Sequence, residues 1–353
     1  EIERYRGTET ADRKIKTLYI GGGTPSILSV NQLDCITQKI KYTFNFCDDI
    51  EASMEMNPGT ASKEKCRALY QMGINRLSVG LQSTNDMELK TLGRIHSYED
   101  FLNTYTWCRE AGFQNINVDL MAALPYQTVE SYTTGLRKII RLAPEHISAY
   151  SLILEEGTPF YQKYNSGCYP LPDEEQERLM YRETEQILAQ AGYERYEISN
   201  YAKKGYACRH NLVYWQGGDY LGLGLGSSSY MDGVRFHNTT DFNIYVNQDA
   251  CVEDREELSV QAKMEEFMFL GLRVMAGVSG TEFEKRFGKT MEDVYGDVLR
   301  KHEEEGLIQI ERKEDRKEAA AAEPAKGKTN IEKVMLTTKG VDVSNYVFAD
   351  FLL

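Results

Sequence analysis

The chain has 353 residues, 41% hydrophobic and 27% charged, a balance that excludes a mainly disordered polypeptide. Lys and Arg number 41 against 54 Asp and Glu, which gives a formal net charge of -13. Such a field repels phosphate backbones, so we expect no sequence-independent binding of nucleic acid. No apolar run reaches the about 18 residues of a membrane span, and the segment after Glu1 lacks a signal peptide's apolar core. A cytoplasmic location is expected.

Strand patterns and helix patterns alternate along the first half of the chain. Runs rich in β-branched and apolar residues predict strands at Lys16–Ile20, Ile50–Met56, Arg76–Leu81, Asn115–Met121 and His146–Ile153. Apolar residues spaced three and four apart predict helices between them, at Val30–Tyr42, Lys63–Met72, Tyr98–Ala111 and Val129–Leu142. Repeated strand–helix–strand units predict an α/β fold with parallel strands and right-handed crossovers.

The pattern changes after Gly157. Asp173–Ala191 predicts a long amphipathic helix, Tyr193–Arg235 is rich in loop residues, and helical spacing resumes from Ser259. The charged, low-complexity segment at about 311–333 predicts a solvated insert. We therefore expect three parts: a barrel domain over 1–165, a capping region over 166–255 and a helical domain over 256–353.

Cysteine spacing gives no local metal site. No CxxC or CxxxC pair exists, and the odd count favours reduced, buried thiols over a disulfide framework. The seven cysteines are Cys35, Cys47, Cys66, Cys108, Cys168, Cys208 and Cys251.

A glycine run follows the first predicted strand. Gly21, Gly22 and Gly23 precede Thr24 and Pro25, and consecutive glycines lose much backbone entropy on folding while packing nothing. The run indicates either a tight turn with Pro25 at the start of a helix or a backbone rim that a ligand approaches closely. A second glycine-rich run, Gly222–Gly226, favours a strand with close backbone approach over a nucleotide loop.

Four polar residues lie in or just past otherwise apolar strand patterns, namely Glu55, Gln82, Arg94 and Asp119. Ligands of parallel α/β folds bind at the carboxyl ends of the strands, so these side chains are expected to converge there. Asp119 has the chemistry to accept protons from ribose hydroxyls, and Arg94 to grip a carboxylate with two hydrogen bonds. Internal or surface salt bridges are the alternative interpretation.

Six motifs in chain order carry a family resemblance. Five resemble the radical S-adenosylmethionine proteins that include oxygen-independent coproporphyrinogen III oxidase: Tyr19–Ser26, Glu55–Pro58, Asn75–Gln82, Leu92–Arg94 and Asn117–Pro125. The sixth, Arg209–Trp215, resembles the HNxxYW element of the HemW haem chaperones, which are relatives of that oxidase. The resemblance runs over nearly the whole chain.

The resemblance implies a partial (β/α)₆ barrel without its first strand, followed by a mixed, mainly helical C-terminal domain. It implies S-adenosylmethionine across the strand ends and a [4Fe–4S] cluster at the barrel mouth. It also implies that His210 ligates haem iron, the alternative being a hydrogen-bonded histidine beneath an aromatic cluster. The implied S-adenosylmethionine contacts are Gly22, Gly23, Thr24, Glu55, Gln82, Arg94 and Asp119, with Ile153 and Ser228 at further matching positions.

The chain departs from the family in one respect. The CxxxCxxC motif that holds the cluster is absent, so we expect an N-terminally truncated chain without cluster ligands. The implied function is a haem chaperone that delivers haem to respiratory haem proteins. The alternatives are the oxidase itself, which decarboxylates two propionates in porphyrin biosynthesis, and an inactive folded remnant.

Overall fold

The computed structural model describes residues 1–247, 252–313 and 331–353. These residues form two compact units, Glu1–His210 and Asn211–Leu353. Each unit has a hydrophobic core of its own. The three-part division expected from the sequence remains a prediction.

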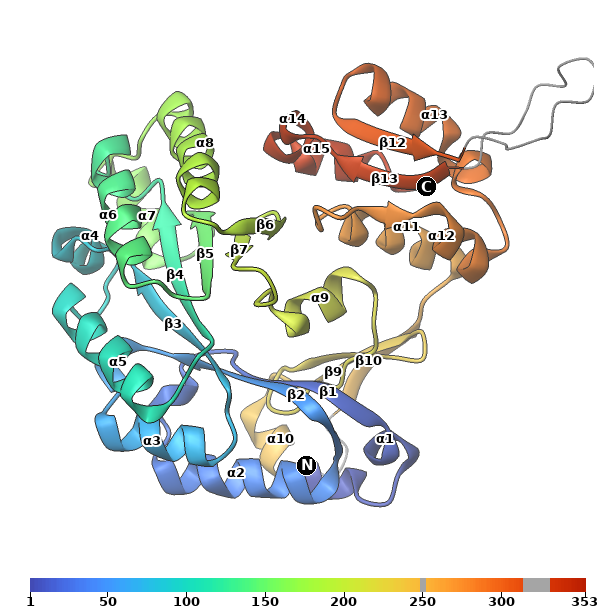
Figure 1. Ribbon diagram of the computed structural model, residues 1–353. Coiled ribbons are helices and arrows are strands. Elements are labelled where there is room, and N and C mark those ends of the chain that lie inside the picture. The colour runs from blue at the N-terminus through green and yellow to red at the C-terminus, as the bar shows by residue number, and fades with distance from the viewer. Residues whose placement is uncertain (248–251, 314–330) are drawn as a thin grey trace, which may run out of the picture. The chain divides into compact units, whose positions relative to one another are not determined.

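The first unit is built on one seven-stranded sheet (Figure 1). Its strand order is β1-β2-β3-β4-β5-β7-β6, in which β1 to β5 are parallel and the last two strands pair antiparallel. Parallel neighbours in chain order confirm the predicted parallel strands and the partial-barrel α/β fold; the right hand of the crossovers stays a prediction. The strands are β1 (Lys14–Ile20), β2 (Asn45–Met56), β3 (Arg76–Gln82), β4 (Ile116–Ala122), β5 (His146–Ser151), β6 (Glu194–Glu197) and β7 (Asn200–Ala202).

Five helices of the first unit, α2, α3, α5, α6 and α8, pack apolar residues against this sheet (Figure 1). Helices α2, α5 and α6 each begin with a capping box, which satisfies two backbone N–H groups that the first turn leaves without partners. The helices that follow β1 to β5 are α2 (Val30–Thr43), α3 (Lys63–Gln71), α4 (Asp86–Thr91), α5 (Tyr98–Ala111), α6 (Val129–Arg141), α7 (Pro159–Asn165) and α8 (Glu174–Gln190). Short helices η1 (Ile2–Tyr5) and α1 (Glu9–Asp12) precede β1, while η2 (Pro25–Ile27) and η3 (Pro58–Thr60) follow β1 and β2.

The two faces of the sheet differ in chemistry because side chains alternate along each strand. Residues such as Met54, Leu77, Val79 and Val118 face the helices and belong to the core. The opposite parity places polar side chains on the inner face: Thr17, Tyr19, Glu51, Ser53, Glu55, Arg76, Ser78, Asn117, Asp119, His146 and Ser148. A polar inner face supplies hydrogen-bonding groups for a ligand.

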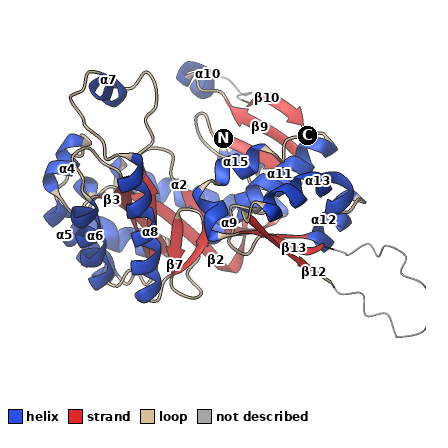
Figure 2. Cartoon of the chain, turned by 90° about the horizontal axis from the view of Figure 1, so that it is seen from above, coloured by secondary structure: helices blue, strands red, loops and turns tan. Residues whose placement is uncertain are grey.

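The stretch between β5 and the end of the unit is less regular. Figure 2 shows α7 on a long loop away from the sheet, and this helix buries none of its residues. Tyr193–Arg235 contains more structure than the sequence pattern predicts, because strands of three to five residues are too short to show a clear alternation. Helix α9 (Arg209–Trp215) begins with the last two residues of the first unit.

The second unit contains two three-stranded antiparallel sheets. The first has β8 (Ser228–Met231), β9 (Val234–Asn238) and β10 (Val252–Glu257), with α10 (Phe242–Asn247) between β9 and β10. The second has β11 (Val278–Ser279), β12 (Ile308–Arg312) and β13 (Ile331–Leu336). Its helices are α11 (Val260–Gly271), α12 (Gly280–Phe287), α13 (Met291–Glu304), α14 (Thr338–Asp342) and α15 (Ser344–Ala349).

Two sequence predictions about the second unit need correction. Gly222–Gly226 forms no strand, although a Cβ on Gly222 would lie 2.2 Å from the carbonyl oxygen of Ser228, so the predicted close approach is present. The predicted insert is too wide, because both of its flanks pair as β12 and β13; residues 314–330 lie outside the described residues.

The described cysteines form no disulfide, but only half of those side chains are buried, whereas the sequence predicted buried thiols; Cys251 lies outside the described residues. Cys66, Cys108 and Cys208 are buried, whereas Cys35 and Cys168 are exposed. None of the described helices combines the length and the hydropathy needed to cross a bilayer.

Candidate functional site

The glycine turn after β1 is exposed and has the backbone freedom that only glycine allows easily. Gly22 and Gly23 have φ angles of 80° and 149°, in the region that L side chains rarely adopt. Pro25 opens η2, as the turn prediction required. The turn is tied to the next strand end, because the backbone N–H of Asn57 donates to Ser26 Oγ over 3.0 Å.

Gly21 leaves room for a pair of side chains on the inner face. The Tyr19 hydroxyl donates to Glu55 Oε1 over 2.9 Å, and the Gly22 N–H also donates to this carboxylate. A Cβ on Gly21 would lie 2.5 Å from the Tyr19 ring and 2.7 Å from Glu55 Oε1. Burial raises the pKa of Glu55, and the nearby charge of Asp119 raises it further. The absence of a side chain at Gly21 therefore leaves the space in which the Glu55 carboxylate lies against the turn.

Gly80 on β3 likewise leaves room for two side chains, those of Arg94 and Gln82. Arg94 Nη2 donates to the Gly80 carbonyl over 2.9 Å, and a Cβ on Gly80 would lie 3.1 Å from that nitrogen and 3.2 Å from Gln82 Nε2. Burial lowers the pKa of Arg94, and its buried Nε has no hydrogen-bond acceptor among the described residues. Gln82 is held in the left-handed region with φ of 73°. A buried guanidinium with an unused donor is suited to an anionic ligand group.

Asp119 lies on β4 between these side chains. Its Oδ1 accepts from Asn117 Nδ2 over 2.7 Å, and its carboxylate also accepts hydrogen bonds from Ser78 and Ser148. Burial raises the pKa of Asp119 although these hydrogen bonds oppose the change. Glu55, Arg94 and Asp119 form no ion pair with one another, in contrast to the alternative predicted from the sequence; this holds for the part of the chain that the structure describes.

Tyr150 on β5 shows that the four predicted polar residues come together. Its hydroxyl donates to Gln82 Oε1 over 3.0 Å. Burial raises its pKa, and the charges of Asp119, Arg94 and Glu55 all act on the same hydroxyl. Tyr150 therefore contacts Gln82 directly and lies within electrostatic range of Glu55, Arg94 and Asp119, which places the four predicted residues in one region at the carboxyl ends of β2 to β5.

The two further matching positions make no contact, within the described residues, of the kind described for this group. Ile153 follows β5 and its side chain is 82% exposed, so it contributes apolar surface and no polar contact. Ser228 begins β8 and belongs to the second unit. Thr24 is half-buried at the start of η2 and makes no side-chain cap there.

His210 is held by three groups on β1 and β2. Its Nδ1 lies 3.0 Å from Thr17 Oγ1, and its ring stacks on Tyr19 with centroids 4.9 Å apart and planes 11° apart. The Glu51 carboxylate accepts the backbone N–H groups of Arg209 and His210 over 3.1 and 3.0 Å. Burial lowers the pKa of His210 to about 4, so the ring is neutral near pH 7. A neutral, oriented imidazole has the protonation state that metal ligation requires.

Sequence reasoning missed the partners that hold these residues, above all Thr17, Tyr19, Glu51 and Tyr150. Their signal was present in the strand parity, since each shares the inner-face parity of a predicted site residue on its own or a neighbouring strand. Which neighbours meet across strands depends on register, and register is not encoded in any single strand.

The described residues contain no group of side chains that could hold an iron–sulfur cluster. Over residues 1–247, 252–313 and 331–353, no three His, Cys, Asp or Glu side chains are close enough to hold a metal ion. The described residues therefore do not fit a [4Fe–4S] cluster. The strand-end residues do fit S-adenosylmethionine, because they present a glycine turn, an unused arginine donor and two carboxylates with raised pKa values.

Two family models match the chain. Residues 3–139 match the radical SAM superfamily, and residues 258–314 match the HemN C-terminal domain. These matches fall within the first and the second unit, respectively.

Curated relatives are similar over most of the chain. The "Heme chaperone HemW" of Lactococcus lactis is 35% identical over 355 residues, which cover 100% of this chain and 88% of that protein. The protein of the same name from Bacillus subtilis is 38% identical over 85% of this chain and 80% of its own length. The structure of coproporphyrinogen III oxidase (HemN) from Escherichia coli matches with a TM-score of 0.79 at 20% identity, covering 96% of this chain and 78% of that one, and shows the shared fold. The chain belongs to the HemW family of radical SAM proteins.

Proposed function

We propose that this protein binds haem through His210 and acts as a haem chaperone. The observation that carries the proposal is the fixed, neutral imidazole of His210, which Thr17, Tyr19 and Glu51 hold in place. Two contacts, with Thr17 and Tyr19, fix the direction of the ring, and the Glu51 carboxylate fixes the backbone that carries it. Such preorganisation reduces the conformational entropy that a ligand must remove on binding.

The second element of the proposal is S-adenosylmethionine at the strand ends. Arg94 and its unused Nε would take the methionyl carboxylate, the backbone of Gly22 and Gly23 would receive the amino group, and Asp119 would accept ribose hydroxyls. When bound, S-adenosylmethionine supplies a radical precursor whose cleavage needs an electron from an iron–sulfur cluster. The proposal for this chain concerns binding alone, because the described residues lack the ligands for that cluster.

Haem titration followed by absorbance tests the first element. We expect the full chain to show a Soret band that sharpens with bound haem, and His210→Ala to weaken binding at least tenfold. His237→Ala is the matched control, since His237 pairs with Asp254 in the second unit and is not part of the proposed site. Equal haem affinity of the His210→Ala and wild-type chains would falsify the assignment.

Two assays extend the test to cargo and to the alternative function. Transfer of bound haem to an apo respiratory haem protein, measured by the recipient's spectrum, is expected of a chaperone. The HemN structure shares the fold and so supports oxidative decarboxylation of coproporphyrinogen III as the second candidate. Turnover of that substrate, with no transfer of haem, would favour the oxidase over the chaperone.

A further inference from the structure

Beside the proposed S-adenosylmethionine site lies another buried carboxylate, that of Glu88. Glu88 is in the first turn of α4, and the residue is only 5% exposed. Within the described residues its carboxylate forms no ion pair, so neutral donors alone compensate for its burial. A buried carboxylate without a cation remains in a fold only when hydrogen bonds satisfy it.

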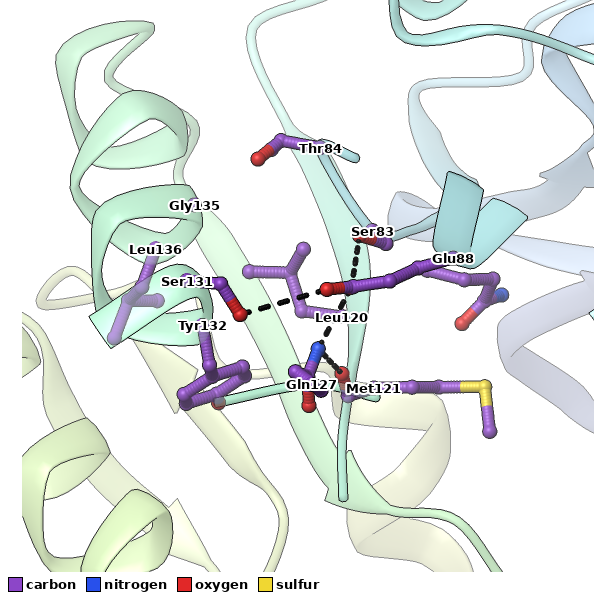
Figure 3. Close-up of a pocket in the computed structure, with 11 residues that line it drawn as sticks. Ser83, Thr84, Glu88, Leu120, Met121, Gln127, Ser131, Tyr132, Gly135 and Leu136 are labelled. Carbon is purple, nitrogen blue, oxygen red and sulfur yellow. Dashed lines mark hydrogen bonds between the residues drawn. The ribbon is translucent and has the colours of Figure 1, made fainter. Parts of the chain in front are cut away.

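Four side chains provide those hydrogen bonds, as Figure 3 shows in part. Glu88 Oε2 accepts from Ser83 Oγ over 2.6 Å and from Gln127 Nε2 over 2.9 Å. Oε1 accepts from Asn85 Nδ2 over 3.4 Å, and Ser131 Oγ lies 3.5 Å away, a weaker contact because its single proton is shared with the Thr128 carbonyl at 3.0 Å. Ser83 and Asn85 follow β3, whereas Gln127 and Ser131 follow β4. The Glu88 carboxylate therefore joins the loops that leave two neighbouring strands.

Both loops contain residues whose backbone has a positive φ, a conformation that L-amino acids rarely adopt. Gln82 has φ of 73°, and Ala123 and Tyr126 have φ of 58° and 64°. Such conformations persist where the surroundings over-determine them, and they concentrate at binding sites. Gln82 immediately precedes Ser83, which donates the shortest of the four bonds to Glu88.

Gln127 carries the restraint into the second loop. Its Oε1 accepts the Leu124 N–H over 3.2 Å, while its Nε2 donates to Glu88. Turning the amide over would direct its oxygen at the carboxylate and its NH₂ at another N–H group. Glu88 thus fixes the amide in the orientation in which its Nε2 also donates to the Met121 carbonyl over 3.4 Å, two residues after Asp119.

We infer that Glu88 is a positioning residue that holds Gln82 and the loop after β4 in the geometry required to bind S-adenosylmethionine. The inference rests on the proposed binding of S-adenosylmethionine at the carboxyl ends of the strands. Close packing supports it, because a Cβ on Gly135 of α6 would lie 2.8 Å from Thr84 Oγ1 in the same pocket. The pocket beside the carboxylate is lined by Gln82, Thr84, Tyr132 and their neighbours, so the site residue and the restraint share one enclosure (Figure 3).

The test compares Glu88→Ala and Ser83→Ala with Thr184→Val in the full chain. Thr184 on α8 lies 2.9 Å from the Tyr132 hydroxyl, and its replacement removes a buried hydrogen bond that touches neither loop. Calorimetry with S-adenosylmethionine measures affinity, and amide hydrogen exchange measures opening of residues 82–85 and 122–127. We expect Glu88→Ala to lower affinity at least tenfold and to speed exchange in both loops, Ser83→Ala to do so to a smaller extent, and Thr184→Val to leave both unchanged.

The outcomes separate this inference from the function on which it rests. Glu88→Ala and Thr184→Val with equal affinity and equal loop exchange overturn the positioning role. A wild-type chain that does not bind S-adenosylmethionine overturns the proposed ligand, and unchanged loop exchange in Glu88→Ala then overturns the restraint itself. If Glu88→Ala does not fold, Ser83→Ala gives the same readouts with one hydrogen bond removed.

Discussion

Two polar groups on the inner face of the same sheet are built in opposite ways. The first, which we call the inner cluster, consists of Ser78, Asn117, His146 and Tyr196. Asn117 donates to Ser78 Oγ over 2.7 Å, His146 Nδ1 lies 2.6 Å from Asn117 Oδ1, and His146 Nε2 lies 2.9 Å from the Tyr196 hydroxyl. Each of these polar groups has a partner inside the protein.

The second, which we call the strand-end group, consists of Glu55, Gln82, Arg94 and Asp119. Burial raises the pKa of both carboxyls and lowers that of the guanidinium, as it also lowers the pKa of His146 in the inner cluster. The difference is that Arg94 Nε lacks an acceptor among the described residues. The two groups therefore differ in one donor. Each member of the inner cluster has a partner inside the protein and stabilises the fold, whereas in the strand-end group the two carboxylates accept hydrogen bonds and Arg94 Nε keeps an unused donor for a ligand.

The largest expected effect is on the inner cluster. His146→Ala leaves Asn117 Oδ1 and the Tyr196 hydroxyl without their partner and opens a cavity at a fully buried position. We expect the free energy of unfolding to fall by about 3 kcal/mol, measured by urea denaturation. The affinity of the folded protein for S-adenosylmethionine should stay within about threefold of wild type, a difference below about 1 kcal/mol. A large loss of affinity with unchanged stability would break the division between the two groups.

Arg94→Ala should show the reverse pattern. Loss of a charge-assisted hydrogen bond to a ligand carboxylate is worth about 1.5 to 3 kcal/mol, which corresponds to about a 10- to 150-fold loss of affinity by calorimetry. Stability should change by less than about 1 kcal/mol, because the desolvation of the guanidinium disappears together with its bond to Gly80.

Arg109→Ala is the matched control for Arg94. Arg109 donates to the Tyr105 hydroxyl and pairs with Glu145 over 2.9 Å, so its removal should lower stability and leave affinity unchanged. If Arg94→Ala destabilises the chain as strongly as Arg109→Ala, Arg94 is a structural residue.

The strands and the residues of the strand-end group could be predicted from the sequence, whereas the inner cluster could not. The five parallel strands were predicted to within a few residues, because their helix-facing residues, such as Met54 and Val79, form an apolar period that needs no partner to be recognised. Glu55 and Asp119 stood out for the same reason, as charges interrupting that period. The inner cluster did not stand out, since Asn117, His146 and Tyr196 come from β4, β5 and β6 and meet only through register and sheet order.

Short elements escaped prediction on physical grounds as well. The antiparallel pair of β6 and β7 has four and three residues, too few for an alternation to differ from chance. Glu88 also escaped prediction, because a glutamate in the first turn of a helix ordinarily marks a favourable dipole interaction at the surface. Its burial depends on Gln127, which is 39 residues away in the chain.

The desolvated position of His210 predicts a pH dependence of the free energy of unfolding. The pKa of His210 is about 4 in the folded chain and lies below the ordinary value near 6.5, so the unfolded chain binds this proton more readily. Stability should therefore fall as the pH drops from about 6.5 towards about 4 and then level off. His210→Gln should flatten that part of the profile in urea denaturation at successive pH values. An unchanged profile would mean that the ring is not held in a desolvated place.

The smallest expected effect concerns Glu55. Because burial raises its pKa, the folded chain binds the proton more readily than the unfolded chain, and stability falls as the pH rises through the raised pKa. Glu55→Gln removes that penalty, and we expect a gain of at most about 1 kcal/mol in the free energy of unfolding at pH 7, together with a loss of ligand affinity. Glu51→Gln should have the opposite sign, because Glu51 accepts the N–H groups of Arg209 and His210 and its charge is matched within the fold. Two glutamates on one strand, four residues apart, would then differ in sign because Glu55 is desolvated near a second carboxylate, Asp119, whereas Glu51 accepts two backbone N–H groups of α9.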